Sequence, residues 1–438
     1  MATLTPARQA CNGETLGQAQ RPRADGHDGA GKTGNSAVSL GTNAKYKNKT
    51  EIDPETGEIF GVFDPMESRV QRFILQSVAR KFLPKSRTDK CLMLRQKGKD
   101  IEVWKSKEFK TTSYSGLQTC GSVWACPVCA AKIAERRRAE IQTAMALHQA
   151  AGGCVNMLTL TCPHQRTDNL AELLAKQAKA LNRFWADRAS KAVFSEMGII
   201  GQIRALEVTH GRLSEQNNGW HPHYHVLQFG GSGVDLSRFN EPQMKDWQVR
   251  LYLVWANACK RAGLGEPSYA HGLKLDDGSK AAKYVSKWGL EDEMTKGHTK
   301  KAISGETPFD FLRSYLADKE DKQAGALFKE FAETFKGKRQ LHWSKGLKKR
   351  FAIGEKTDEQ LSTEIEDSAR LLGKITIEQW RDVLASKGRG TVLQLAASGG
   401  WELVEIYLLS IQRSEAMNAR KTPARSAART AVFSGVNG

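Results

Sequence analysis

Residues 151–290 alternate between short apolar runs and longer segments with helical spacing. The short runs predict strands at 154–161, 200–209, 221–229 and 271–276. Apolar residues recurring every three or four positions predict helices over 168–190 and 241–262, and another from about 277. Strands joined by a short loop, such as the one containing Asn217-Asn218-Gly219, pair antiparallel. The β-α-β-β-α-β-α order therefore predicts an α+β fold, an antiparallel sheet with helices on one face.

The flanking sequence differs in character from this central part. Helical spacing begins near Glu67, a cysteine-containing segment occupies 88–130, a helix is expected from Ala130 to Ala150, and residues 355–410 also read as helical. The two ends lack apolar periodicity. We expect five regions: a disordered 1–60, a helical and Cys-rich 61–150 that binds zinc and DNA, a central domain with a basic extension over 151–350, a helical 351–411, and a basic disordered tail over 412–438.

The charge balance indicates an acidic partner. The 438 residues carry a formal net charge of +18, which favours nucleic acid, although a role in solubility alone would also produce it. No run of about 18 apolar residues could cross a bilayer, and the first residues lack the apolar core of a secretory signal. We therefore expect a cytoplasmic protein with reduced thiols and no membrane partner.

The run Trp220-His221-Pro222-His223-Tyr224-His225 is the strongest indication of chemistry. Alternate side chains of a strand point to the same face, so the three imidazoles would share one side. Neutral imidazoles are good ligands for a divalent metal. The alternative is a solvated, histidine-rich strand. Because proline cannot donate to a ladder, Pro222 belongs near the strand's start or on an edge, which makes His221 the weakest of the three candidates.

The hairpin supplies a carboxylate to this metal site. If residues 200–209 pair with 221–229 around a loop centred near 215, Glu207 lies opposite His223. A mixed nitrogen and oxygen site suits Mg²⁺ or Mn²⁺, and a remaining coordination position could take a phosphate oxygen. An exposed strand residue or a salt-bridge partner is the alternative role of Glu207.

Tyr284 and Lys287 are candidates for a nucleophile and its helper. They are three residues apart on the helix expected after the last strand, so they share a face. A tyrosine oxygen can attack phosphorus and form a phosphotyrosine, and a nearby lysine can hold the phosphate or favour the phenolate. Taken alone, such a tyrosine usually serves packing, and its significance here comes from its position after the histidine strand.

Three segments follow one another in order: Leu158-Thr159-Leu160-Thr161, His221-Pro222-His223-Tyr224-His225 and Tyr284-Val285-Ser286-Lys287. Together they resemble the motifs of plasmid rolling-circle replication initiators of the single-tyrosine His-hydrophobe-His (HUH) endonuclease family. The resemblance covers roughly residues 85–350 and implies an HUH-like fold. It also implies that His223 and His225 bind the metal, that Tyr284 is the nucleophile and that Lys287 assists it.

The resemblance also implies an activity and its partners. Such an initiator binds its plasmid origin as double-strand and single-strand DNA, nicks one strand, stays joined to the 5′ phosphate, and works with a host helicase and DNA polymerase. One departure concerns termination. Some relatives carry a glutamate four residues before the tyrosine, where this chain has Lys280, and Glu291 is only a weak substitute. A conjugative relaxase, a single-tyrosine transposase, and a non-catalytic zinc-dependent DNA-binding regulator are the alternatives.

Four of the eight cysteines fall in one region: Cys91, Cys120, Cys126 and Cys129. Cys126-Pro127-Val128-Cys129 is a CxxC knuckle, and four thiolates can bind a structural Zn²⁺ tetrahedrally. Buried thiols beside a turn are the plain alternative, and a redox role is a remote one. The sequence therefore predicts a zinc site before the central domain.

Residues 336–350 contain seven basic residues and no acidic one. Cations interleaved with an aromatic residue are typical of a groove that tracks a nucleic-acid backbone, although an ordinary solvated surface has the same composition. Arg136, Arg137 and Arg138 could also reach phosphates, though not all three from one helix face. The candidate DNA contacts are Lys283, Arg339, Trp343, Lys345, Lys348, Lys349 and Arg350.

Overall fold

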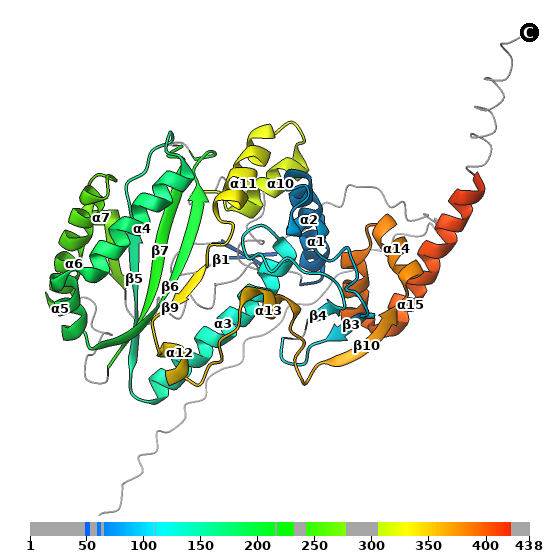
Figure 1. Ribbon diagram of the computed structural model, residues 1–438, viewed down its shortest axis with the longest axis horizontal. Coiled ribbons are helices and arrows are strands. Elements are labelled where there is room, and N and C mark those ends of the chain that lie inside the picture. Colours follow the sequence, from blue (N-terminus) through cyan, green and yellow to red (C-terminus); the bar gives the residue numbers. More distant parts are fainter. Residues whose placement is uncertain are drawn as a thin grey trace, which may run out of the picture. The chain divides into compact units, whose positions relative to one another are not determined.

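A computed structural model describes residues 49–52, 59–62, 65–109, 111–214, 217–231, 242–276 and 305–421 (Figure 1). All of them belong to one of the two units into which the chain divides, residues 48–438. Two short strands, β1 (Lys49–Ile52) and β2 (Ile59–Val62), pair antiparallel where disorder was expected up to residue 60.

A five-stranded antiparallel sheet forms the centre of the described structure. Its strands are β5 (Cys154–Thr161), β6 (Ile199–His210), β7 (Trp220–Gly230), β8 (Leu273–Asp276) and β9 (Leu341–Trp343). Their order is β8-β5-β7-β6-β9, so the histidine strand β7 is the middle one. The expected α+β class is confirmed. The basic segment contributes β9, which the sequence did not predict, at the edge beside β6.

Helices cover one face of this sheet through the periodic apolar residues seen in the sequence. They are α4 (Leu170–Ala186), α5 (Arg188–Glu196) and α6 (Pro242–Arg261), with the short α7 (Tyr269–Gly272) before β8. Phe184 and Trp255 are fully buried there in the same core as Leu160 and Val226. The single helix expected over 168–190 is two helices because the Asp187 side chain accepts from Ala189 N and caps the second one.

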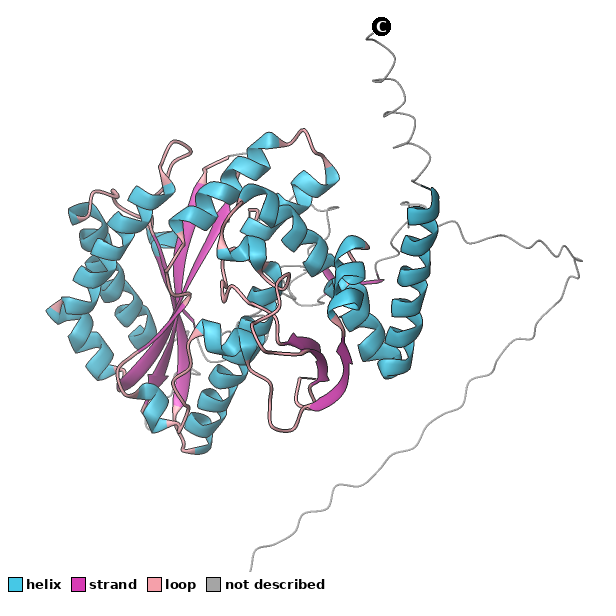
Figure 2. Ribbon diagram, turned by 45° about the vertical axis from the view of Figure 1, so that its right-hand side comes forward, coloured by secondary structure: helices cyan, strands magenta, loops and turns pink. Residues whose placement is uncertain are grey.

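A helix also packs on part of the opposite face (Figure 2). The β7 histidines lie on this face, because they alternate along the strand in phase with Leu227. The second half of α3 (Pro127–Ala150) buries Ile141 and Met145 against Met157, Ile203 and Leu227. The short α12 (Leu347–Arg350) adds Leu347 to the same core. Glu207 and the β7 histidines lie beyond this apolar core, on the same face of the sheet.

A second, three-stranded sheet joins segments from both ends of the described chain. Its order is β10-β3-β4, with β10 at Arg370–Ile375, β3 at Ile101–Lys105 and β4 at Thr112–Ser115. The helical reading of 355–410 is wrong at 370–375, because six residues show no clear period and their partner β3 is about 270 residues away in sequence. The rest of that region is mostly helical, as expected.

Seven further helices are described. They are α1 (Pro65–Phe82), α2 (Arg87–Lys90), α10 (Pro308–Ala317), α11 (Lys322–Thr334), α13 (Asp358–Thr363), α14 (Ile377–Ala385) and α15 (Arg389–Lys421). One of them, α15, contacts all three strands of this second sheet. The last helix breaks at Gly400, where φ is 73°. It continues to Lys421, so the tail expected to be disordered from 412 begins as a helix.

Candidate metal centre

Glu207, His223 and His225 converge on one face of the sheet. Glu207 pairs with His223 in the β6–β7 register, as the hairpin argument predicted. Its Oε2 lies 3.4 Å from His223 Nε2 and 3.6 Å from His225 Nε2. One ligand atom from each residue lies within 4.8 Å of the other two, which is a spacing that a single divalent ion can bridge.

The second nitrogen of His225 is held from the neighbouring strand. Thr159 lies opposite His225 in the β5–β7 register, and its Oγ1 is 3.1 Å from His225 Nδ1. This contact leaves Nε2 directed at Glu207, and such outer contacts orient metal-binding imidazoles. Thr159 belongs to the Leu158–Thr161 segment, which the sequence analysis treated only as a core strand. Its alternation with buried leucines was the available signal of a side chain on the histidine face.

The protonation state of His225 also fits metal binding. Burial lowers its pKa to about 4, against smaller opposing effects of Glu207 and Asp276. The imidazole is therefore neutral at pH 7, with a lone pair available to a cation. The neutral imidazole of His225, the half-buried His223 ring and a carboxylate oxygen of Glu207 are thus compatible with a bound divalent metal.

His221 is not brought into this group. Its ring lies 4.6 Å from that of His164 and 5.2 Å from that of His223, measured between centroids. Burial lowers the pKa of His221 to about 4. The structure therefore pairs His221 with His164, a residue that the sequence analysis did not single out.

The candidate nucleophile and its neighbours lie outside the described residues. This applies to Tyr284, Lys287 and Lys283, as well as to Lys280 and Glu291. Asp276 is the last residue described before this gap, which ends at residue 304. Its side chain is buried, at 4% exposed, and its charge raises the pKa of His225 slightly against the effect of burial. Asp276 is a second residue near the centre that sequence reasoning missed, because a four-residue strand gives no signal of its partners.

Glu306, which follows the undescribed residues 277–304, is held against the end of β6. The backbone of Glu306 bonds to that of His210 in both directions at 2.8 Å, beside the end of β6. Arg212, with a side chain only 5% exposed, forms ion pairs at 2.7 Å with Glu306 and 2.9 Å with Asp321. These buried pairs fix Glu306 against the strand that carries Glu207.

The buried His210 at this anchor predicts a pH dependence of stability. Burial, with help from Arg212, lowers its pKa to about 4, whereas an unfolded histidine titrates near 6.5. As pH falls from about 6.5 towards 4, only the unfolded state gains the proton, so the free energy of unfolding drops by up to ~1.4 kcal/mol per pH unit. The contribution is fully present above pH 6.5. Urea denaturation at pH 7, 6 and 5 measures it.

The matched variant is His210→Asn, which keeps an acceptor for Arg212 N, now bonded to His210 Nδ1 at 3.0 Å, and cannot titrate. We expect a shallower acid loss of stability in this variant. Identical slopes for the variant and the wild type would contradict the assignment.

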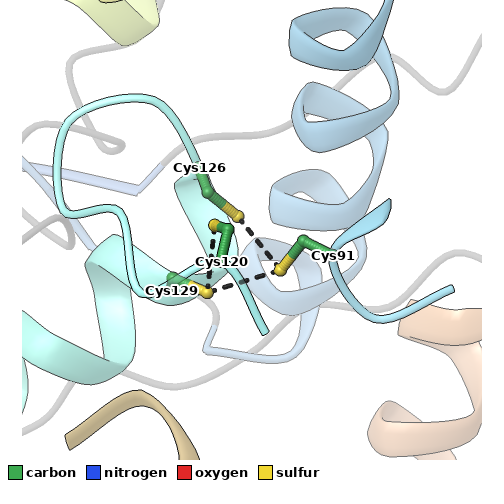
Figure 3. A group of neighbouring side chains, drawn as sticks. All are labelled: Cys91, Cys120, Cys126 and Cys129. Carbon is green, nitrogen blue, oxygen red and sulfur yellow. Dashed lines mark hydrogen bonds between the residues drawn. The ribbon is translucent and has the colours of Figure 1, made fainter. Parts of the chain in front are cut away.

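The four cysteines of the second candidate site meet in one buried group (Figure 3). Cys91 Sγ lies 3.4 Å from Cys129 Sγ and 3.8 Å from Cys126 Sγ, and Cys120 Sγ lies 3.6 Å from Cys129 Sγ. A disulfide needs about 2.05 Å. Four sulfurs each ~2.3 Å from a central zinc would lie about 3.8 Å apart, so the group fits a tetrahedral ion.

The surroundings of the cysteines hold compensating groups. Gln76 Nε2 donates to Cys126 Sγ at 3.2 Å, and Arg389 Nη1 donates to Gln76 Oε1 at 2.8 Å. Burial raises the pKa of Cys126, but hydrogen bonds from the other three thiols together hold it well below its usual value. The buried Arg389, from the start of α15, brings a positive charge to a site that becomes anionic as its thiols ionise.

The basic residues separate into internal and exposed groups. Lys348 is 4% exposed, with Nζ 3.1 Å from Glu140 and 5.3 Å from the Trp343 ring centroid, so its charge is used inside the protein and not at a DNA surface as expected. Arg136 and Arg137 pair with carboxylates in the same way. The exposed candidates are Arg339, Lys345, Lys349 and Arg350.

Comparisons with known proteins match the part of the chain that carries the centre. Residues 115–262 match a family model described as "Replication protein". The chain is 27% identical over 306 residues to "Protein rep" of Streptomyces lividans, covering 56% of this chain and 66% of that protein. It is 31% identical over 147 residues to "Neomycin resistance protein" of Streptomyces cyanogenus, covering 28% and 33%.

Neither alignment spans two thirds of the relative's own length. No solved structure matches the chain. Within the described part of the chain, no helix is long and apolar enough to cross a membrane. The family match contains Glu207, His223, His225 and three of the four clustered cysteines, and it ends before Tyr284. Residues 115–262 thus resemble the replication-protein family, and the expected resemblance of this chain to plasmid replication initiators is confirmed.

Proposed function

We propose that this chain is a plasmid replication initiator that nicks one strand at its double-strand origin and later rejoins it. The observation that carries the proposal is the Glu207–His223–His225 group, which lies within the region similar to replication proteins. A nick exposes a 3′ hydroxyl that primes rolling-circle replication. A net charge of +18 suits a DNA substrate.

Tyr284 is the proposed nucleophile. Its phenolic oxygen bonds to the scissile phosphorus while the bond from phosphorus to the 3′ oxygen breaks, and that oxygen takes up a proton to become a hydroxyl. The protein stays joined to the 5′ phosphate, and the reverse reaction reseals the strand. Lys287 holds the phosphate or favours the phenolate. A Mg²⁺ or Mn²⁺ ion bound by Glu207, His223 and His225 would supply Lewis-acid stabilisation of the scissile phosphate.

The length of the chain permits this assignment. Tyr284 is eight positions after Asp276 in the sequence. An extended chain spans at most about 29 Å over that length. Asp276 is close enough to His225 to influence its pKa. A tyrosine tethered so near the metal centre is a reasonable nucleophile for it.

The other parts of the chain have supporting roles in this proposal. Arg339, Lys345, Lys349 and Arg350 contact DNA phosphates, with the half-buried Trp343 beside them, whereas Lys348 does not. The cysteine group holds a structural Zn²⁺. A host helicase and DNA polymerase act after the nick, in the cytoplasm.

Tyr284→Phe tests the proposal, because it removes only the attacking oxygen. We expect it to abolish the covalent protein–DNA adduct when the variant is incubated with supercoiled origin plasmid and Mg²⁺ or Mn²⁺. The adduct is detected as a band shifted in a denaturing gel and mapped by mass spectrometry of the linked peptide.

Tyr269→Phe is the matched control, because Tyr269 is 49% exposed on α7 and its ring contacts Tyr252. It should form the adduct at the wild-type level. A Tyr284→Phe protein that still forms a 5′-linked adduct would show that the nucleophile is another residue. A wild-type protein that forms no adduct on any single strand would remove the enzyme proposal itself.

A further inference from the structure

A cavity of about 100 Å³ lies beside the cysteine group, away from the metal centre on the sheet. Its walls come from α1, β4, α3, the end of α13 with the residues after it, and α15, and it is partly open. Cys129 contributes one wall, so the cavity and the cysteine group share a boundary. Neither the nicking chemistry nor the structural zinc uses this space.

The lining of the cavity is strongly cationic. Five cationic side chains face it, against two carboxylates, Glu135 and Glu366. The cations are Arg69, Arg72, Lys132, Arg136 and Arg138. Hydroxyl groups of Thr111 and Ser113 add neutral donors to the same walls. Guanidinium, ammonium and hydroxyl donors around a small space are the chemistry that binds a tetrahedral oxyanion.

Part of this positive charge is not satisfied inside the protein. Arg136 is 9% exposed, and although its Nη2 pairs with Glu366, its Nε has no hydrogen-bond partner. Among the described residues, Lys132 and Arg138 form no salt bridge within 4 Å and no side-chain hydrogen bond. Burial and the neighbouring Arg136 lower the pKa of Lys132 to about 8, although Glu364 and Glu366 attract its charge more weakly. Leaving a buried donor or cation without a partner costs free energy, which a bound anion would recover.

The size of the cavity limits the ligand. It is smaller than the ~150 Å³ cavity that accommodates benzene in a protein core. A whole nucleotide would not fit, and an internal phosphodiester is flanked by a sugar on each side. A free phosphate ion, or a terminal phosphate whose remaining part projects outwards, does fit.

We propose that this cavity, lined by Lys132, Arg136 and Arg138, is a second anion site that binds a phosphate dianion, either free or at the end of a larger molecule. The site lies among the elements that surround the cysteines, so a bound phosphate would tie α1, β4 and α3 together. This site is separate from the proposed nicking centre and does not depend on it.

Three probes test the site by isothermal titration calorimetry on the full-length zinc-loaded protein at pH 7.5. They are inorganic phosphate, a dinucleotide with a 5′-terminal phosphate, and the same dinucleotide with a 5′ hydroxyl, each against a sodium chloride control of equal ionic strength. We expect phosphate or the 5′-phosphorylated dinucleotide to bind and the hydroxyl form not to bind. Binding of phosphate alone assigns a free anion, and binding of the dinucleotide assigns a terminal phosphate.

Lys132→Met and Arg138→Gln should each weaken this binding by about tenfold to a hundredfold, since each removes one charge-assisted contact. The exposed Lys322→Met, on α11, is the charge-matched control and should bind as the wild type does. Zinc content and thermal melting confirm that each variant is folded. The proposal is overturned if neither phosphate probe binds at millimolar concentration, or if both cavity variants bind as tightly as the control.

Because calorimetry needs neither Mg²⁺ nor an origin, this result is independent of the nicking proposal. A protein that binds phosphate here but forms no covalent DNA adduct would retain the anion site and lose the proposed function.

Discussion

His223→Ala is expected to lower metal-dependent nicking of the origin plasmid by at least about 100-fold while leaving origin binding largely intact. Loss of a residue that merely orients a ligand costs 10–100-fold, so loss of a ligand itself should cost no less. The His223 ring lies between those of His221 and His225, with its Nε2 3.4 Å from Glu207, so its loss removes one of the three candidate ligand atoms. Initial nicking rates over a series of Mn²⁺ concentrations measure the effect.

Two further variants should lose less nicking activity than His223→Ala. Thr159→Val removes the contact to His225 Nδ1 and should cost about 10–100-fold, with a shift to higher Mn²⁺ requirement. His221→Ala lies outside the three-residue group and should retain far more activity than His223→Ala. Equal losses in the His221 and His223 variants, or an unfolded His223→Ala protein, would favour a structural role for the whole histidine strand.

Cys126→Ser is expected to remove one equivalent of zinc and to lower the melting temperature by roughly 10 °C or more. A structural zinc contributes its binding free energy to folding, often ~10 kcal/mol or more, and about 1 kcal/mol corresponds to ~2–4 °C in a domain of 150–250 residues and to less in a larger one. Cys126 is fully buried and lies at the start of α3, whose second half supports the central sheet. Loss of the metal should therefore weaken both sheets. Elemental analysis and calorimetry of the purified protein measure the two effects.

Cys162→Ser is the burial-matched control for this prediction. Cys162 is 2% exposed and lies outside the cysteine group, so its replacement should cost some stability but leave the zinc content unchanged. If the wild-type protein contains no zinc after purification without chelators, the sulfurs are ordinary buried thiols. Zinc retained in full by Cys126→Ser would place the ion elsewhere.

The hairpin shows how far local sequence reasoning reaches. The turn residues and the alternation of β7 were enough to place Glu207 opposite His223, because a short loop fixes an antiparallel register and a strand has a period of two. The same reasoning placed β5 at residues 154–161, with the same limits as the structure shows. It did not identify β9, because three residues carry no periodicity and the partner strand β6 is about 140 residues away.

The charge composition of residues 336–350 predicted side-chain roles less well than the alternation of the β6–β7 hairpin did. Counting charges treated Lys348 and Lys349 alike, but Lys348 is buried against Glu140 and Lys349 is exposed. The partner Glu140 lies on α3, in the Cys-rich region, and nothing near Lys348 in the sequence predicts that contact. Whether a lysine forms an internal ion pair or stays available to a ligand depends on which distant carboxylate reaches it in the fold.

By itself, the sequence determined the α+β class, the order of the central strands and helices, and the pairing of Glu207 with the histidines. These features follow from local periodicity and turn chemistry, which act over a few residues. Only the tertiary structure decided that His221 pairs with His164, that Thr159 orients His225, and that four cysteines up to 38 residues apart meet within 4.8 Å. Those contacts join separate strands and helices, so they are set by packing of the whole sheet and its helices and not by any single segment.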